Sequence, residues 1–260
     1  MNTDSMKTMK KLLEANTASG QRRLVDVFRD FCELSALSLR NGADLHGRHT
    51  GGGWDTREAR YLEIAGGYSQ EENERFAELL AHVVVTLEEG LDDVLGNLYM
   101  SLELGNGGLG QFFTPFSIST VMAKMTVADI AKAQNRPEII TIQEPACGSG
   151  GMVLAVANEL REIGVNYQQE IHVTATDVDI VAVHMTYIHC ALAFIPAHIV
   201  HGNTLTTEVF SVWPTPAHII GGFDWKLRRL DRECAASDVG GDGENTATPA
   251  VHPEGATTTV

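Results

Sequence analysis

The sequence lacks long hydrophobic runs, paired cysteines and an excess of basic residues. No stretch approaches the roughly 18 uninterrupted apolar residues of a membrane-spanning helix, and the first twenty residues lack the apolar segment of a secretory signal. The four cysteines, Cys32, Cys147, Cys190 and Cys234, show no C-x-x-C spacing, so they form neither a zinc site nor a disulfide framework. These absences predict a cytoplasmic protein in a reducing compartment, without membrane contact.

Basic residues are scarce relative to acidic ones. The 260-residue chain has 19 Lys and Arg against 34 Asp and Glu, which gives a formal net charge of -15. Such a surface repels phosphates, so the composition argues against a chain that binds nucleic acid without help. Two interpretations of the charge stay open: an ordinary acidic surface, and a surface that imitates the charge of DNA.

The first 105 residues carry helical patterns. Apolar side chains recur on one helical face over residues 20–40. Ser69 and Glu72 have the spacing of a capping box, and Gly90 is placed to end the helix that follows them. Helical spacing resumes over residues 91–104. We therefore predict an all-helical N-terminal region, residues 1–105.

Strands and helices alternate in the second half of the sequence. This pattern predicts a parallel α/β sheet over residues 106–230. The expected elements are a helix over 118–133 capped by Ser117, strands over 139–143, 171–177 and 197–203, and helices over 151–164 and 180–194. From residue 231 to residue 260 the chain is rich in Gly, Ala, Thr and Pro without periodicity, which predicts a disordered tail.

A glycine-rich loop follows the first expected strand, in the stretch "QEPACGSGGMV". Glycines at 148 and 150 permit positive φ and let a ligand approach the backbone, and the next helix directs free N–H groups at that point. Ligands of open α/β sheets bind at the carboxyl ends of strands, where this loop lies. The phosphate-binding patterns G-x-x-x-x-G-K-[ST] and G-x-G-x-x-G with its later acidic partner are both absent. An ordinary tight turn remains the competing interpretation.

Two more polar residues follow strands in the same way. Asp177 ends the second expected strand, where a carboxylate can accept both hydroxyls of a ribose, or can serve as a solvated strand end or helix cap. Asn203 ends the third, where its amide can bind the polar edge of an adenine, or can be a plain turn residue. Together with the glycine loop, they favour a ligand site over three unrelated turns.

The histidines, the segment "WPTP" and the Cys147 thiol do not indicate a metal or catalytic site. His184 and His189 lie five apart on a helix, and His198 and His201 fall on opposite faces of a strand, so the sequence predicts no metal site. Residues 213–216, "WPTP", read as a rigid turn. Cys147 belongs to the glycine loop and has no setting typical of a reactive thiol.

Four motifs occur in a fixed order: "GQFFTP" (110–115), "EPACGSGG" (144–151), "TATDVD" (174–179) and "HGNTL" (201–205). They resemble the N6-adenine DNA methyltransferases of the kind found as modification subunits of type I restriction–modification systems. The resemblance implies a class I S-adenosylmethionine-dependent methyltransferase fold with a Rossmann-like parallel sheet, here incomplete, and S-adenosylmethionine as the cofactor. It implies cofactor-binding roles for the following residues: Phe113, Thr114, Pro115, Glu144, Cys147, Gly148, Ser149, Gly150, Gly151, Asp177 and Asn203.

The chain departs from this family in one respect. The family's catalytic motif, an Asn or Asp, two prolines and an aromatic residue, is absent, and the nearest echo, "VWPTP", lacks the polar residue and the adjacent prolines. The catalytic residues are therefore not identified. Three functions stay open. The first is DNA adenine-N6 methylation with a DNA-reading, specificity-type partner and other restriction–modification subunits. The second is a catalytically inactive cofactor-binding relative that modulates restriction through protein contacts, and the third is an acidic anti-restriction protein.

Overall fold

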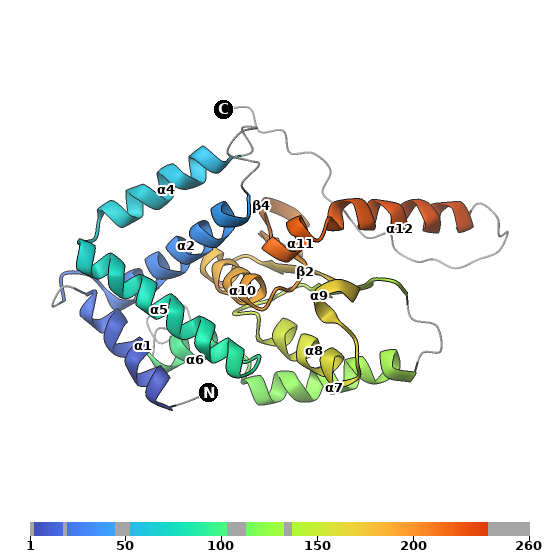
Figure 1. The fold of residues 1–260 in the computed structure, drawn as a ribbon, viewed down its shortest axis with the longest axis horizontal. Helices are drawn as coiled ribbons and strands as arrows, with labels where there is room; N and C mark the ends of the chain where they lie inside the picture. The colour runs from blue at the N-terminus through green and yellow to red at the C-terminus, as the bar shows by residue number, and fades with distance from the viewer. Residues whose placement is uncertain (1–2, 18–19, 45–52, 103–112, 133–136, 239–260) are drawn as a thin grey trace. The chain divides into compact units, whose positions relative to one another are not determined.

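The computed structural model describes residues 3–17, 20–44, 53–102, 113–132 and 137–238. The chain divides into two compact units, residues 1–223 and 224–260, and the candidate site lies within the first. The helices are α1 (Thr3–Ala15), α2 (Leu24–Ala43), α4 (Trp54–Gly66), α5 (Gln70–Glu89), α6 (Val94–Ser101), α7 (Phe116–Lys132), α8 (Gly151–Glu162), α9 (Tyr167–Glu170), α10 (Ile180–Leu192), α11 (Pro216–Ile220) and α12 (Phe223–Asp238). The strands are β1 (Ile140–Glu144), β2 (Ile171–Asp177), β3 (Ala197–Asn203) and β4 (Glu208–Pro214) (Figure 1).

The described N-terminal elements are helical, as the apolar periodicity predicted. Ser69 caps α5, because its Oγ accepts from the Glu72 amide at 3.2 Å while the Glu72 carboxylate accepts from the Ser69 amide at 2.8 Å. The predicted capping box is therefore confirmed, and Gly90 follows the last residue of the helix. Helix α1 packs on α5 and α4 packs on α2, so that the apolar faces of these helices share one core.

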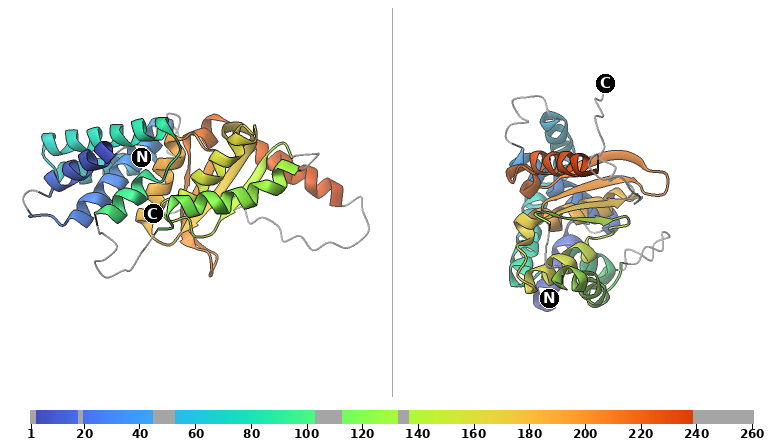
Figure 2. Two further views of the ribbon diagram at one scale, coloured as in Figure 1. Left: turned by 90° about the horizontal axis from the view of Figure 1, so that it is seen from below. Right: turned by 90° about the vertical axis from the view of Figure 1, so that its right-hand side faces the viewer.

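The sheet has the order β1-β2-β3-β4, and its first three strands are parallel. The bounds of β2 and β3 are those predicted from the sequence, which confirms the α/β fold class. The predicted cap of α7 was wrong: the helix begins at Phe116, so Ser117 lies inside it, and the Pro115 carbonyl accepts from the amides of Ile118 and Ser119. Helix α7 runs beside α8 (Figures 1 and 2).

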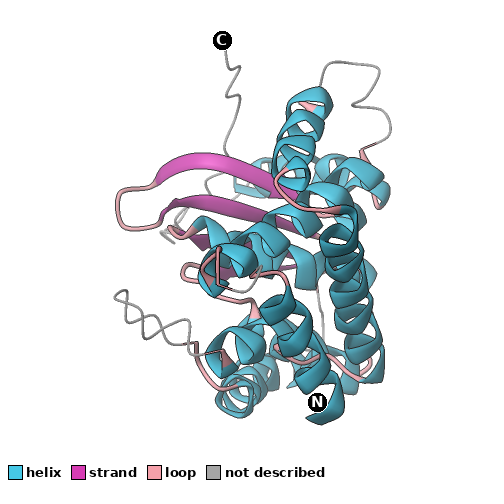
Figure 3. Ribbon diagram, turned by 90° about the vertical axis from the view of Figure 1, so that its left-hand side faces the viewer, coloured by secondary structure: helices cyan, strands magenta, loops and turns pink. Residues whose placement is uncertain are grey.

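The fourth strand was missed by the sequence prediction. Residues 213 and 214, predicted as part of a turn, end β4, which pairs with β3 in the antiparallel direction after a hairpin (Figure 3). Thr215 then caps the short helix α11. Proline is tolerated here because β4 has β3 as its one neighbour in the described sheet, and Pro214 is its last residue.

The two faces of the parallel strands differ in polarity. Side chains alternate along a strand, so that Val173 and Ala175 face the core, which α10 closes by packing on β2 and β3. Thr174 and Thr176 point the opposite way and are half-buried. Strand β1 likewise exposes Thr141 and is paired on one side only, with β2, among the described strands.

The predicted tail begins within a helix. Helix α12 extends to Asp238, so residues 231–238 are helical, and residues 239–260 lie outside the described part of the chain. None of the helices described has the length and hydrophobicity that crossing a bilayer requires.

Candidate functional site

The glycine-rich loop turns sharply between β1 and α8. The Cys147 amide donates to the Thr176 carbonyl of β2 at 2.9 Å, and the Gly150 amide donates back to the Cys147 carbonyl at 2.8 Å. Gly148 and Gly150 have φ values of 54° and 91°, in the left-handed region where a side chain is disfavoured. The loop is therefore a fixed backbone structure at the carboxyl end of β1.

Asp177 connects this loop to the end of β2. One carboxylate oxygen accepts from the Gly148 amide at 2.8 Å, and the other accepts from the Asp179 amide at 2.9 Å. The hydrogen bond to Gly148 spans 29 residues of sequence. The structure thus brings together two of the motifs that the sequence predicted to share a site.

A cavity of about 380 Å³ lies against the loop. Its volume falls within the range of sites for small molecules and cofactors. Eight of the eleven predicted cofactor-binding residues line it: Phe113, Thr114, Glu144, Cys147, Gly148, Ser149, Gly151 and Asp177. The other lining residues are Asp93, Ser119, Met122, Ala146 and Met152.

A second cavity of about 270 Å³ shares Asp177 and Ala146 with the first and is lined by Asn203. The Asn203 Oδ1 accepts from the amides of Leu205 and Thr206, at 3.0 and 3.3 Å. The carbonyl half of this side chain therefore holds the local turn, and its NH2 group is the half suited to a ligand. Asp177 lies where the two cavities meet.

Two predicted residues do not line either cavity. Pro115 follows Thr114 and starts α7 through its carbonyl. Gly150 lies against α10, where a Cβ would meet the Thr186 Oγ1 at 3.1 Å and the Thr186 Cα at 3.2 Å. Gly150 thus lets the loop approach α10 closely. "GQFFTP" begins at residues 110–112, which lie outside the described residues.

Sequence reasoning missed Asp93, which caps α6 and lines the main cavity. Its carboxylate accepts from the Gly96 amide at 2.9 Å and from the Ser149 hydroxyl at 2.5 Å. A Cβ on Gly96 would overlap both the Asp93 carboxylate and the Ser149 hydroxyl. The spacing Asp-x-x-Gly before a helix signals a cap, but nothing local links Asp93 to a loop 56 residues away.

Buried His189 fixes the same junction from α10. Its Nδ1 lies 2.8 Å from the Ser149 carbonyl, and its Nε2 accepts from the Leu95 amide at 3.2 Å. This assigns the ring proton to Nδ1. Burial lowers the pKa of His189, which agrees with a neutral ring that donates on one side and accepts on the other. The His189 ring therefore connects the helical region to the glycine loop through hydrogen bonds at both of its nitrogens.

The charge of the main cavity is negative. Asp93, Glu144 and Asp177 line it, and its lining within the described chain includes no Lys or Arg. Burial, with the Asp177 charge as a smaller contribution, raises the pKa of Glu144. Such a cavity repels phosphate groups and attracts cations. Burial raises the pKa of Cys147 to about 12, so this thiol stays protonated and is no nucleophile at neutral pH.

The segment most similar to the family's catalytic motif, "VWPTP", lies far from this cavity. Because β4 is antiparallel, Pro214 pairs with His198 at the beginning of β3, whereas Glu208 pairs with Asn203 at its end. "VWPTP" is therefore at the amino end of the parallel strands, and the cavity is at their carboxyl ends. In the part of the chain that the structure describes, this segment cannot supply a catalytic group to the cavity.

Comparison with known proteins agrees with this geometry. An α/β sheet with a glycine loop at the end of its first strand and a carboxylate at the end of its second is the arrangement expected of S-adenosylmethionine-dependent methyltransferases. The N-6 DNA methylase family model matches residues 92–226, more than half of the chain, so the chain belongs to this family. S-adenosylmethionine is accordingly its cofactor.

One solved structure with some similarity is that of a class I S-adenosylmethionine-dependent methyltransferase from Listeria monocytogenes. It has 15% sequence identity and a TM-score of 0.40, and the match covers 75% of this chain. The match covers 52% of that protein, so the chain spans about half its length. No sequence among curated proteins matches the chain significantly.

The residues present fit the cofactor. A Cβ on Gly148 would lie 3.0 Å from the Phe113 ring, so glycine keeps open a space between loop and ring that a side chain would fill. S-adenosylmethionine carries an ammonium and a sulfonium, and both charges are favoured beside three carboxylates. A nucleotide cofactor with phosphates would be repelled by the same groups.

Proposed function

We propose that the chain is the cofactor-binding part of a DNA adenine-N6 methyltransferase of the restriction–modification type, which acts with a DNA-reading partner. The observation that carries the proposal is the negatively charged cavity at the carboxyl ends of β1 and β2, where the Gly148 amide donates a hydrogen bond to the Asp177 carboxylate. The family membership supports the reaction class. When bound, S-adenosylmethionine supplies a methyl group activated by its sulfonium charge.

Each side of the cavity has a distinct task in this proposal. Asp93 and Glu144 hold the ammonium of the methionine part, because both residues are acidic and line the main cavity. Asp177 binds the ribose hydroxyls, because it lies at the junction of the two cavities. The Asn203 amide donates to the adenine ring in the second cavity. Phe113 covers Gly148 and keeps water from the loop.

A partner is proposed because methyl transfer to DNA requires two things: attraction to the phosphates, and a group that holds the target adenine. The net charge of -15 opposes binding to phosphates, and a target adenine must leave the helix and be held beside the cofactor. The edge of β1 that faces away from β2 has no partner strand in the described sheet, and α7 exposes Val121 and Met125, with exposed fractions of 59% and 73%. A further polypeptide segment that covers this edge can bring the catalytic group.

The proposal predicts that methyl transfer depends on that partner. We expect transfer of tritium from labelled S-adenosylmethionine to unmethylated DNA when the chain is combined with its co-purifying specificity-type subunit, and none with the chain alone. The control is the same DNA with its adenines already N6-methylated, which should accept no label. Transfer by the chain alone would contradict the need for a partner.

A catalytically silent cofactor-binding protein is the second candidate. The position of "VWPTP" at the opposite edge of the sheet supports it, since this segment is the nearest echo of the family's catalytic motif. Cofactor binding without transfer under either condition would establish this candidate and overturn the first.

A further inference from the structure

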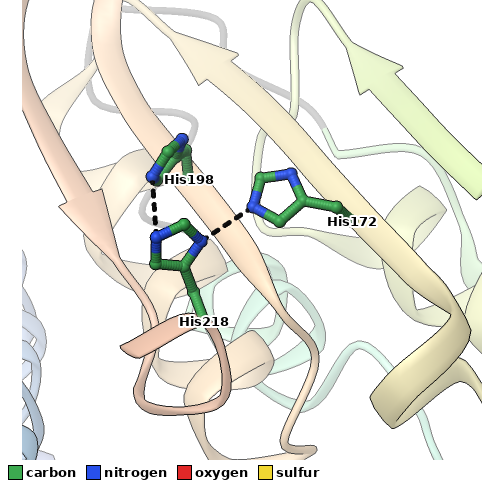
Figure 4. Close-up of side chains that lie close together, drawn as sticks. All are labelled: His172, His198 and His218. Atoms are coloured by element: carbon green, nitrogen blue, oxygen red, sulfur yellow. Dashed lines mark hydrogen bonds between the residues drawn. The ribbon is translucent and has the colours of Figure 1, made fainter. Parts of the chain in front are cut away.

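Three histidines converge at the end of the sheet opposite to the cofactor cavity. His172 lies on β2, His198 on β3 and His218 on α11 (Figure 4). The His172 Nε2 is 2.9 Å from the His218 Nδ1, and the His198 Nε2 is 3.2 Å from the His218 Nε2. One ring nitrogen from each residue can be chosen so that all three lie within 4.8 Å of one another.

The backbone holds the three rings together. His198 pairs with Thr174 across two parallel strands, and His172 is two residues before Thr174, so the two histidines lie on the same face of the sheet. Buried Thr215 fixes α11 to the start of β3: its hydroxyl accepts from the Ala197 amide at 2.9 Å and donates to the Ile195 carbonyl at 2.7 Å. His218 is therefore presented by an anchored helix, not by a free loop.

The spacing suits a borderline transition metal ion. Tetrahedral zinc holds imidazole nitrogens at about 2.0–2.1 Å, which places neighbouring ligand nitrogens about 3.3–3.4 Å apart. His218 uses a different ring nitrogen in each of its two contacts and can give an ion only one of them. With one nitrogen chosen from each residue, the three lie within 4.8 Å of one another, so rotations of the rings must bring them to the zinc spacing. Neutral imidazole favours zinc over magnesium or calcium, which take oxygen ligands.

We propose that His172, His198 and His218 bind one zinc ion through three imidazole nitrogens, with the fourth position open to water. His172 and His218 are 3% and 2% exposed, and half-buried His198 gives the ion access. The ion joins β2, β3 and α11 and stabilises this end of the sheet. Asp177 is five positions after His172 along β2, about 17 Å in a strand, so the site is independent of the cofactor cavity.

The test uses the full-length chain, freed of metal with a chelator and kept in a reducing agent. Calorimetric titration with Zn²⁺ should show one equivalent bound, and thermal melting should shift upward with Zn²⁺ concentration. Co²⁺ in place of Zn²⁺ should give the visible absorption of a four-coordinate site without a thiolate charge-transfer band, which excludes binding at cysteines.

Three single substitutions, His172→Asn, His198→Asn and His218→Asn, should each weaken Zn²⁺ binding by at least about 100-fold. His198→Asn is the most informative variant, because substitution at a half-buried position disturbs folding less than substitution at a buried one. Circular dichroism checks that each variant is folded. The matched control is His82→Asn on α5, outside the cluster, which should bind Zn²⁺ like the unmodified chain. S-adenosylmethionine binding should stay within about twofold in all folded variants, since Zn²⁺ and cofactor sites are separate.

The absence of stoichiometric Zn²⁺ binding by the unmodified chain would overturn the proposal. Undiminished binding by His198→Asn would do the same. In both cases the three histidines form a hydrogen-bonded network that holds no ion.

Discussion

Replacement of Asp177 by alanine is expected to weaken S-adenosylmethionine binding by about 100-fold. A charged hydrogen bond contributes about 1.5–3 kcal/mol, and 1.4 kcal/mol corresponds to a factor of ten, so the loss of the bonds to two ribose hydroxyls accounts for this change. The substitution also leaves the Gly148 amide without its acceptor and so loosens the loop. Calorimetry on the folded variant measures the effect.

Asp179→Asn is the matched control. It removes the same charge two residues away, while asparagine still caps α10, where the Asp179 carboxylate now accepts from the Val181 amide. We expect its cofactor affinity to stay within about threefold of that of the unmodified chain. Equal losses in both variants would show that net charge, and no specific contact of Asp177, governs binding.

Gly148→Ala is expected to reduce cofactor affinity by at least about tenfold, through filled space and altered loop geometry. The new Cβ would lie 3.0 Å from Phe113, which lines the cavity, and the φ of 54° disfavours any side chain. Left-handed backbone costs a non-glycine residue about 1–2 kcal/mol, so stability should also fall by this amount.

Gly164→Ala separates these two effects. Gly164 has a φ of 80° after the end of α8, but a Cβ there meets nothing within 4 Å. It should lose stability like Gly148→Ala while binding the cofactor normally. Normal binding by Gly148→Ala would mean that the loop does not hold the cofactor at this position.

The parts of the fold predicted correctly are those whose signals are local. Strands β2 and β3 are short apolar segments bounded by polar residues, and the Ser69 cap depends on a residue three positions away. Strand β4 was missed because Trp213 and Pro214 resemble a turn, and only pairing with β3 makes them a strand. A proline at the last position of such a strand leaves no local sign of that pairing.

In the candidate site, too, residues with a local sequence signal were predicted and residues placed by long-range contacts were not. Glycine, acid and amide motifs after successive strands predicted Gly148, Asp177 and Asn203 near one another, because the carboxyl ends of parallel strands share an edge. Asp93 was not predicted, since its contact with Ser149 depends on how the helical region packs against the loop. The three-histidine cluster was missed for a related reason: comparing histidines in pairs along one element cannot detect ligands from three elements.

The negative charge of the cavity agrees with the lack of the two phosphate-binding patterns in the sequence. We expect the three carboxylates around the glycine loop to favour a cationic ligand, although the same type of loop binds anions in other α/β proteins. The terminal N–H groups of α8 remain suited to the cofactor's carboxylate. We therefore expect discrimination between cofactors to depend on the residues that surround the loop more than on the loop.

Calorimetric titration of the unmodified chain with S-adenosylmethionine and, in parallel, with ATP tests whether the cavity binds a cationic cofactor. Both ligands carry adenosine, but the first bears positive charges and the second bears phosphates. We expect one equivalent of S-adenosylmethionine to bind and ATP to bind at least about 100-fold more weakly, a difference of about 2.7 kcal/mol. Equal or tighter binding of ATP, or no binding of S-adenosylmethionine, would contradict the assignment of this cavity to the cofactor.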